Sequence, residues 1–311
     1  MRAKIISRHL FIFVIVSGVL TFHSDAAFVG RVWDAIFNPC VCKCGVPNRE
    51  ARLVGGEYLT GHEFPWAASI QVNDDGNSNV SSLAATLITP KYLLTSASNV
   101  IGITPREIKV TLGQTDRCHP DTTSVNMSVD RIMIHPEYNP GSRAHDIALV
   151  RLNTPAKLDK RISPICLPSA NYRYANQVGI VYGWSDNSNV TCRAKKVGLP
   201  ILSAEECLKG FNDPEYITSD KGCLGVPGSV SPVCKGDSGS PVMYRSKHGS
   251  YDIVGVLGDK NECEEINLAT YASVVDHLPW ILQNTKDSCF CSRLNLQLPG
   301  LPKGPLKLFE L

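Results

Sequence analysis

Gly236-Asp237-Ser238-Gly239-Ser240-Pro241 is the stretch that decides the fold of this chain. A serine between glycines can occupy a tight turn, where its hydroxyl and two backbone N–H groups converge on one point. A nucleophilic serine with an oxyanion hole needs this arrangement. A bare Gly-x-Ser-x-Gly pattern also occurs in ordinary surface turns, so its meaning depends on what else the chain contains.

Length, charge and motif content narrow the possible functions. The chain has 311 residues, 43% of them hydrophobic, which is enough for more than one small core. The formal net charge of +2 gives no electrostatic reason to expect nucleic acid or a membrane surface as a partner. The sequence has no zinc-ligand spacing, phosphate loop or dinucleotide motif, so we expect no cofactor and no metal.

The start of the chain is typical of a secretory signal peptide. Residues 1–26 contain basic residues, then the apolar run 10–20, then small residues that suit a cleavage site. This segment is too short and wrongly flanked for a membrane anchor. Residues 27–52 follow as a short, cysteine-rich pro-segment. We therefore expect the protein to be secreted and extracellular.

Secretion changes how the cysteines and some asparagines are interpreted. In a secreted chain, the 12 cysteines are expected to form disulfides rather than to remain thiols or to bind zinc. The three Asn-x-Ser/Thr sites fit surface loops of a glycoprotein, although each can also be an unused match; they are Asn79, Asn126 and Asn189.

Short apolar or alternating runs, separated by turn residues, predict two antiparallel β-barrels. The strands expected in the first barrel are residues 67–72, 82–88, 92–96, 108–112, 129–135 and 147–152. Those expected in the second are residues 179–182, 197–202, 241–245, 253–257 and 270–274. Residues 276–282 are expected to form a closing helix, and residues 286–311 an extended tail held by Cys289 and Cys291.

These features together resemble the trypsin and chymotrypsin family of serine proteases, over about residues 53–282. The resemblance rests on the serine stretch, preceded by Val233-Cys234-Lys235, and on Phe64-Pro65-Trp66, His145-Asp146-Ile147-Ala148-Leu149 and Gly183-Trp184. It implies an all-β domain over residues 53–285, with two six-stranded-type barrels, a C-terminal helix and several disulfides. The cysteine-rich leader is similar to that of secreted invertebrate members.

The resemblance also implies most of the disulfide pairs. The expected bridges are Cys44–Cys166, Cys207–Cys223, Cys234–Cys263 and Cys118–Cys192. Cys40 and Cys42 would then join Cys289 and Cys291, in an order that the sequence leaves open. Two further bridges of the family are missing at both ends, because Leu83 and Asn99 occupy one pair of positions and Gly179 and Tyr244 occupy the other.

By resemblance, Ser238 is the nucleophile, Asp146 is the orienting acid, and the backbone N–H groups of Gly236 and Ser238 form the oxyanion hole. The family places its catalytic base in Leu-Thr-Ala-Ala-His-Cys, where this chain reads Leu94-Thr95-Ser96-Ala97-Ser98-Asn99. Ser98 therefore replaces the histidine, and a hydroxyl cannot accept the proton at physiological pH. Loss of a triad member lowers turnover by about 10⁴- to 10⁶-fold.

The predicted substrate pocket also departs from the family. Pro232 stands at the base of the pocket, where trypsin-like members have an aspartate. Gly258-Asp259-Lys260 replaces the Ser-Trp-Gly strand that pairs with substrate, and Ala269 replaces a glycine of the pocket wall. These changes predict poor binding of a protease substrate.

Arg52-Leu53 resembles the activation junction of the family. Cleavage after the basic residue would free an amino terminus that can reach Asp237 and order the oxyanion loop. Arg52 can equally be an exposed residue that any protease nicks.

These observations predict a secreted, non-catalytic serine protease homologue. It would act as a binding partner, cofactor or decoy in an extracellular proteolytic cascade of immunity, venom or reproductive fluid. Its partners would be extracellular proteins, namely proteases, their zymogens, substrates or inhibitors. Two alternatives remain: a weakly active serine endopeptidase, which hydrolysis dependent on Ser238 would reveal, and a structural component of an extracellular matrix.

Overall fold

A computed structural model describes residues 42–48, 56–72, 81–114, 116–118, 123–186, 189–211, 217–233, 235–258 and 268–293. All of them belong to the compact unit Cys40–Leu311. The predicted signal peptide, the Arg52-Leu53 junction and the last part of the tail lie outside the described residues. The same holds for these predicted site residues: Cys40, Asn79, Cys234, Asp259, Lys260 and Cys263.

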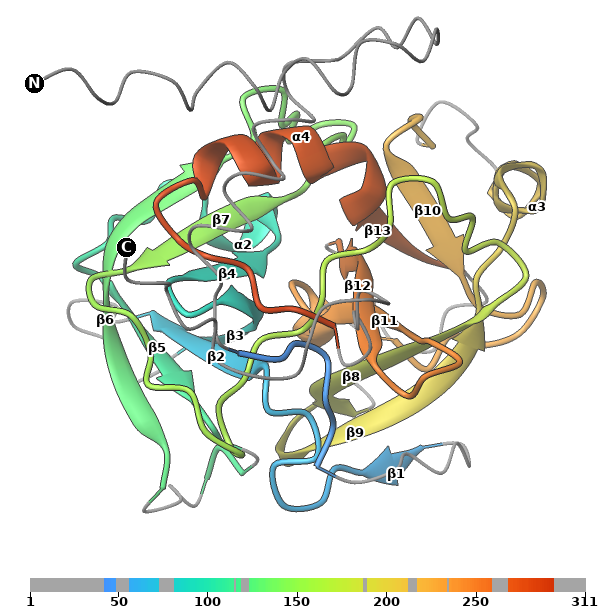
Figure 1. Cartoon of the computed structure of the whole chain (residues 1–311). Coiled ribbons are helices and arrows are strands. Elements are labelled where there is room, and N and C mark those ends of the chain that lie inside the picture. Colours follow the sequence, from blue (N-terminus) through green and yellow to red (C-terminus); the bar gives the residue numbers. More distant parts are fainter. Residues whose placement is uncertain are drawn as a thin grey trace, which may run out of the picture. The chain divides into compact units, whose positions relative to one another are not determined.

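The first half of the domain is a closed six-stranded barrel with the order β2-β3-β4-β7-β6-β5 (Figure 1). Its strands are β2 (Ala67–Val72), β3 (Ser81–Thr89), β4 (Tyr92–Thr95), β5 (Ile108–Leu112), β6 (Val125–Ile134) and β7 (Ala148–Leu152). Every strand predicted for this barrel is present. The apolar runs are explained by burial, because Leu93, Leu149 and Val150 are fully inaccessible to solvent.

The second half is a seven-stranded sheet with the order β1-β9-β8-β11-β12-β13-β10. Its strands are β1 (Glu57–Tyr58), β8 (Val178–Asp186), β9 (Asn189–Pro200), β10 (Lys221–Leu224), β11 (Pro241–Arg245), β12 (Tyr251–Leu257) and β13 (Ala269–Ser273). An antiparallel bridge between Ile201 and Leu224 links the end of β9 to β10. Six strands therefore close into a second barrel, and β1 adds a seventh strand outside the ring.

The strands β1 and β10 were not predicted. Strand β10 is short, and its sequence Lys221-Gly222-Cys223-Leu224 has no clear apolar period. Gly222 is required there because a Cβ atom would lie 2.2 Å from the ring of Tyr271, on the neighbouring strand β13. Tertiary packing, rather than local pattern, decides this strand.

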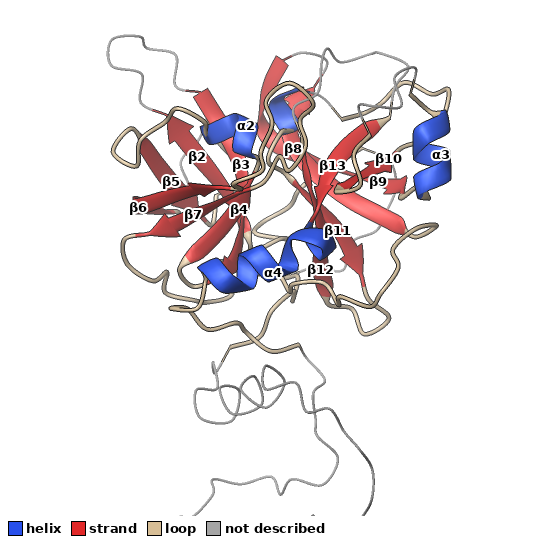
Figure 2. Cartoon of the chain, turned by 90° about the horizontal axis from the view of Figure 1, so that it is seen from above, coloured by secondary structure: helices blue, strands red, loops and turns tan. Residues whose placement is uncertain are grey.

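The helices are short and lie outside the barrels (Figure 2). They are α2 (Ala97–Val100), α3 (Ala204–Lys209), α4 (Val274–Asn284) and the 3₁₀ turn η2 (Lys235–Asp237). The predicted closing helix is α4, which begins earlier and ends later than the sequence indicated. Its N-terminus is capped by Ser273, whose side chain accepts a hydrogen bond from Asp276 N–H. Helix α4 extends across the junction of the two barrels.

Aromatic side chains fill the contact between the barrels. The rings of Phe64 and Trp66 stack with centroids 5.5 Å apart, and Phe64 also stacks on Tyr182 at 5.6 Å. Trp66 packs against Tyr251 and donates its indole N–H to the sulfur of Met243 at 3.1 Å. The Phe-Pro-Trp landmark of the sequence therefore joins the start of β2 to strands β8, β11 and β12 of the second barrel.

Disulfides connect segments that are distant in sequence. Cys44 is bonded to Cys166, Cys118 to Cys192 and Cys207 to Cys223, as the resemblance predicted. The bond Cys42–Cys291 joins the two ends of the chain and decides the order that the sequence left open. Cys289 is also disulfide-bonded, and its pairing with Cys40 stays a prediction, as does Cys234–Cys263.

The register of β8 and β11 supports the alignment of a lost family bridge. Gly179 and Tyr244 lie directly opposite each other in this pair of strands. The Tyr244 hydroxyl is 3.0 Å from the Tyr172 hydroxyl, and the Tyr244 ring packs against Tyr174 with centroids 5.3 Å apart. The aromatic side chains of Tyr172, Tyr174 and Tyr244 therefore stabilise this pair of strands in place of a disulfide.

A buried ion pair between Glu63 and Lys196 attaches the segment after β1 to β9. The side chains of Glu63 and Lys196 are 1% and 5% exposed, whereas Glu57, 3.8 Å from the Lys196 ammonium, is 43% exposed. We expect Glu63→Gln to lower the free energy of unfolding by about 3 kcal/mol, because the buried ammonium would keep only the more distant and exposed carboxylate of Glu57. The matched variant Glu57→Gln should cost less than about 1 kcal/mol. Equal effects in urea unfolding would contradict this assignment.

Candidate functional site

Ser238 lies at the point where the two barrels meet. It follows the turn η2, and Gly239 after it has a positive φ of 83°. A Cβ atom at Gly239 would lie 2.4 Å from the carbonyl oxygen of Ala84 in β3, so only glycine fits. Gly239 N–H also donates to Leu257 O in β12, at 2.9 Å. The serine turn is therefore held between one strand of each barrel.

The Ser238 hydroxyl is paired with another hydroxyl. Its Oγ atom is 3.0 Å from Ser96 Oγ, and Asn99 Nδ2 donates to the Ser238 carbonyl oxygen at 2.9 Å. In the described part of the chain, no imidazole is hydrogen-bonded to Ser238. A serine hydroxyl cannot remove a proton from another serine at neutral pH, so this pair does not activate a nucleophile.

Ser98 lies in α2 and forms two hydrogen bonds with Asp146. Its backbone N–H donates to Asp146 Oδ1 at 2.7 Å, and its hydroxyl donates to Asp146 Oδ2 at 2.9 Å. The Asp146 side chain is buried, so its carboxylate needs such donors. The structure thus brings together the predicted acid Asp146, the predicted nucleophile Ser238 and Ser98 at the position of the base. However, Asp146 is hydrogen-bonded to Ser98, whereas Ser238 is hydrogen-bonded to Ser96.

Ser96 was not among the site residues predicted from the sequence. A signal for it existed, because Thr95-Ser96-Ala97 differs from the Thr-Ala-Ala of the family motif at the same position. Asn99, which stands where the family has a cysteine, was noted only for the missing disulfide. Ser96 and Asn99 are both hydrogen-bonded to Ser238, and only the folded structure shows this.

Asp237 is buried beside the nucleophile and faces a cation from a distant loop. A Cβ atom at Gly183 would lie 1.8 Å from Asp237 Oδ1, so the carboxylate packs against the glycine backbone. The Arg117 guanidinium lies 4.0 Å from the centroid of the neighbouring Trp184 ring. Burial lowers the pKa of Arg117 to about 10, and the charge of Asp237 opposes this shift. Arg117 therefore stays protonated at neutral pH.

The loop that carries Arg117 is fixed to β9. Arg117 N–H donates to Cys192 O at 2.7 Å, and the disulfide Cys118–Cys192 fastens the next residue. An isolated bridge between Asp116 and Arg193 adds a further contact. The sequence predicted the disulfide Cys118–Cys192 but not its effect, which is to hold Arg117 near Asp237.

The predicted pocket residues are only partly described. Pro232 is exposed, and Ala269 is buried in β13. Gly258 N–H donates to Thr270 O at 3.1 Å, and a Cβ atom on Gly258 would lie 3.5 Å from Asp146 Oδ2. The roles of these residues in substrate binding stay predictions. Of the predicted glycosylation sites, Asn126 is exposed on β6 and Asn189 begins β9.

Two β-barrels that meet at a buried serine turn define the class of trypsin-like serine protease domains. The family profile described as Trypsin matches residues 53–281, and the chain belongs to this family. Across the helices that the structure describes, none is both long and apolar enough to span a bilayer.

Relatives of this chain have different names and lengths. "Serine proteinase stubble" of Drosophila melanogaster is 27% identical over 84% of this chain, which spans 35% of that relative's length. "Clotting factor G beta subunit" of Tachypleus tridentatus is 28% identical over 78% of this chain and 82% of the relative. "Haptoglobin" of Bos taurus is 26% identical over 85% of this chain and 69% of the relative. The chain is therefore similar both to proteins named as proteases and to proteins that are not.

The bonds of Asp146 predict a structural effect of its removal. We expect Asp146→Ala to lower the free energy of unfolding by about 2–3 kcal/mol, because it leaves the Ser98 N–H without its acceptor. Asp146→Asn should cost about 1 kcal/mol, since its amide oxygen can accept from that N–H while the Ser98 hydroxyl rotates to accept from the amide. Urea unfolding measures both. Wild-type stability of Asp146→Ala would rule out a structural role for the acid.

Proposed function

We propose that this protein is a non-catalytic member of the trypsin family that acts by binding other proteins in an extracellular proteolytic cascade. One observation carries the proposal: the position of the catalytic base holds Ser98, whose hydroxyl donates to Asp146, while the Ser238 hydroxyl contacts Ser96. The acid and the nucleophile therefore belong to two separate pairs, and among the described residues no imidazole is hydrogen-bonded to Ser238.

Acid–base chemistry supports this proposal. Attack by a serine requires a base with a pKa near neutrality that takes up the hydroxyl proton and later returns it to the leaving group. Ser96 and Ser98 offer hydroxyl groups, which do neither at physiological pH. The remaining catalysis, from the oxyanion hole and binding alone, would lie about 10⁴- to 10⁶-fold below that of a complete triad.

The setting of the proposed function is extracellular. Disulfides persist mainly in oxidising compartments, and the structure contains several. A relative named as a clotting factor favours a proteolytic cascade, and relatives named haptoglobin are not named as proteases. The partners that suit this protein are proteases, zymogens, protease substrates or inhibitors, for which it would serve as cofactor or decoy.

A first experiment asks whether Ser238 performs any chemistry. The secreted protein, before and after cleavage at Arg52, is incubated with a peptide library and with a phosphonate probe, and Ser238→Ala serves as the control. We expect wild type and Ser238→Ala to be indistinguishable in both assays. Labelling or hydrolysis that depends on Ser238 would favour the alternative, a weak endopeptidase with a base that we have not identified.

Restoring the histidine should not restore the protease. We expect Ser98→His, alone or with Ser96→Ala, to show no trypsin-like cleavage, because Pro232 stands where the pocket needs an acid for basic substrates. The double variant removes the hydroxyl that contacts Ser238, so it separates the effect of Ser96 from that of the pocket. Efficient cutting after arginine or lysine by either variant would show that the pocket is intact.

We also propose that cleavage after Arg52 regulates partner binding. The new amino terminus at Leu53 would bring a second positive charge toward Asp237, which already interacts with Arg117. We expect the cleaved protein to bind its partner more tightly than Arg52→Gln, which cannot be cut there, as measured by capture from the fluid into which the protein is secreted. Equal binding by both would argue that Arg52 is an exposed residue without a switching role.

A further inference from the structure

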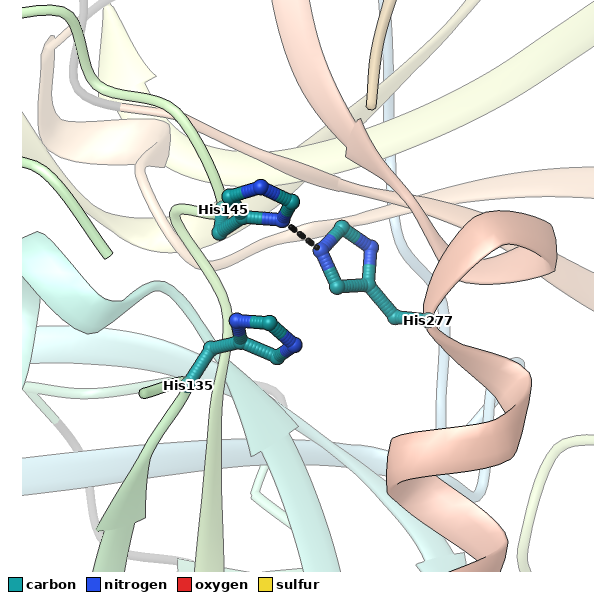
Figure 3. Close-up of side chains that lie close together, drawn as sticks. All are labelled: His135, His145 and His277. Carbon is teal, nitrogen blue, oxygen red and sulfur yellow. Dashed lines mark hydrogen bonds between the residues drawn. The ribbon is translucent and has the colours of Figure 1, made fainter. Parts of the chain in front are cut away.

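Three histidines from separate segments gather next to Asp146. His135 directly follows β6, His145 lies in the loop before β7, and His277 belongs to α4. Figure 3 shows that the three rings surround one common space. His135 and His277 are buried, whereas His145 is half-buried.

The distances suit a shared ligand. One ring nitrogen from each histidine lies within 4.8 Å of the other two, and His145 Nδ1 is 3.0 Å from His277 Nε2. In a tetrahedral site with Zn–N bonds of about 2.0–2.1 Å, nitrogen ligands are about 3.3 Å apart. The rings of His135 and His145 are stacked, with centroids 4.7 Å apart and planes 14° from parallel, so one of the two rings has to turn before all three nitrogens face one ion.

Groups around the cluster orient two of the rings. The His277 Nδ1–H donates to Ser273 O at 2.6 Å, which leaves the lone pair of Nε2 directed toward His145. The backbone N–H of His145 donates to Asp220 Oδ2 at 2.7 Å, and this oxygen is 3.8 Å from His145 Nδ1. Metal-binding histidines commonly donate their other ring N–H to such an acceptor, as His277 does to Ser273 O.

The charges around the cluster favour a cation. Asp220 is buried, and its carboxylate accepts hydrogen bonds from the Thr218 hydroxyl at 2.6 Å and from the His145 backbone N–H at 2.7 Å. Imidazole side chains beside a buried carboxylate are suited to bind a divalent metal.

We propose that His135, His145 and His277 form a binding site for one divalent transition-metal ion, with Zn²⁺ as the preferred ion. Imidazole ligands favour zinc over calcium and magnesium, which need oxygen ligands. With Nδ1 of His145 as a ligand, its proton moves to Nε2, which faces the Glu137 carboxylate at 3.7 Å. Water would complete the coordination. The proposal does not depend on whether Ser238 is catalytic.

The bound ion would link the two halves of the domain. His145 immediately precedes Asp146 in the first barrel, whereas α4 follows the last strand of the second sheet. A metal bound only by the folded protein stabilises it in proportion to its affinity. The other group of nearby ligand types, Asp116, Cys118 and Cys192, does not offer such a site, because its two sulfurs are bonded to each other.

The test uses the full chain without a polyhistidine tag, freed of metal with a chelator. Zn²⁺ is titrated by calorimetry, and Co²⁺ by its visible absorption, which reports tetrahedral nitrogen ligands. We expect one ion per chain and a rise in Tm with Zn²⁺. His145→Asn and His277→Gln should each weaken binding by at least about 100-fold, since changes in second partners alone cost about 10–100-fold.

His248→Gln is the matched control, because His248 is exposed and lies outside the cluster. It should bind Zn²⁺ as the wild type does. The Tm of each variant without metal shows whether it is folded, and His145→Asn, at the half-buried position, keeps the test valid if His277→Gln does not fold. Wild-type affinity in folded His145→Asn, or no binding by the wild type, would overturn the proposal and leave a metal-free stack of histidines.

Discussion

A carboxylate buried beside the junction of two β-barrels has to be hydrogen-bonded, and in this chain Ser98 supplies two of the bonds to Asp146. In an active protease, a buried aspartate at this place orients the imidazole of the base. In this chain, the buried Asp146 fixes Ser98 of α2 instead. The Ser98 hydroxyl donates to Asp146, and the Ser238 hydroxyl is hydrogen-bonded to Ser96. The separation of acid from nucleophile follows from these local bonds, while the surrounding barrels retain the architecture of a protease.

Asp237, next to the serine turn, is likewise held in place by its surroundings. This acid is buried against the backbone of Gly183, and the Arg117 guanidinium over Trp184 provides a positive field. The arginine is present without any cleavage, because a disulfide and a backbone hydrogen bond fix its loop to β9. A surface that is held by covalent links and buried charges suits binding of other proteins, since little order has to be created when a partner arrives.

The histidine cluster lies one residue from Asp146, so the two sites share a loop. His145 and Asp146 direct their side chains to opposite neighbours, His277 in one case and Ser98 in the other. An ion held by the three rings would restrain this loop from the side of α4. The two halves of the domain would then be joined both by the aromatic side chains around Trp66 and by the metal near α4.

The sequence by itself determined the family fold, most strands, the described disulfides except the order of the end-to-end links, and the absence of histidine at the position of the base. The strands follow from local periodicity, whereas the disulfides and the position of the base follow from the resemblance to the trypsin family. It could not find β10, the pairing of Ser96 with Ser238, the approach of Arg117 to Asp237 or the gathering of three histidines. Each of these brings together residues far apart in the chain, such as His135 and His277, and only the tertiary packing places them close to each other.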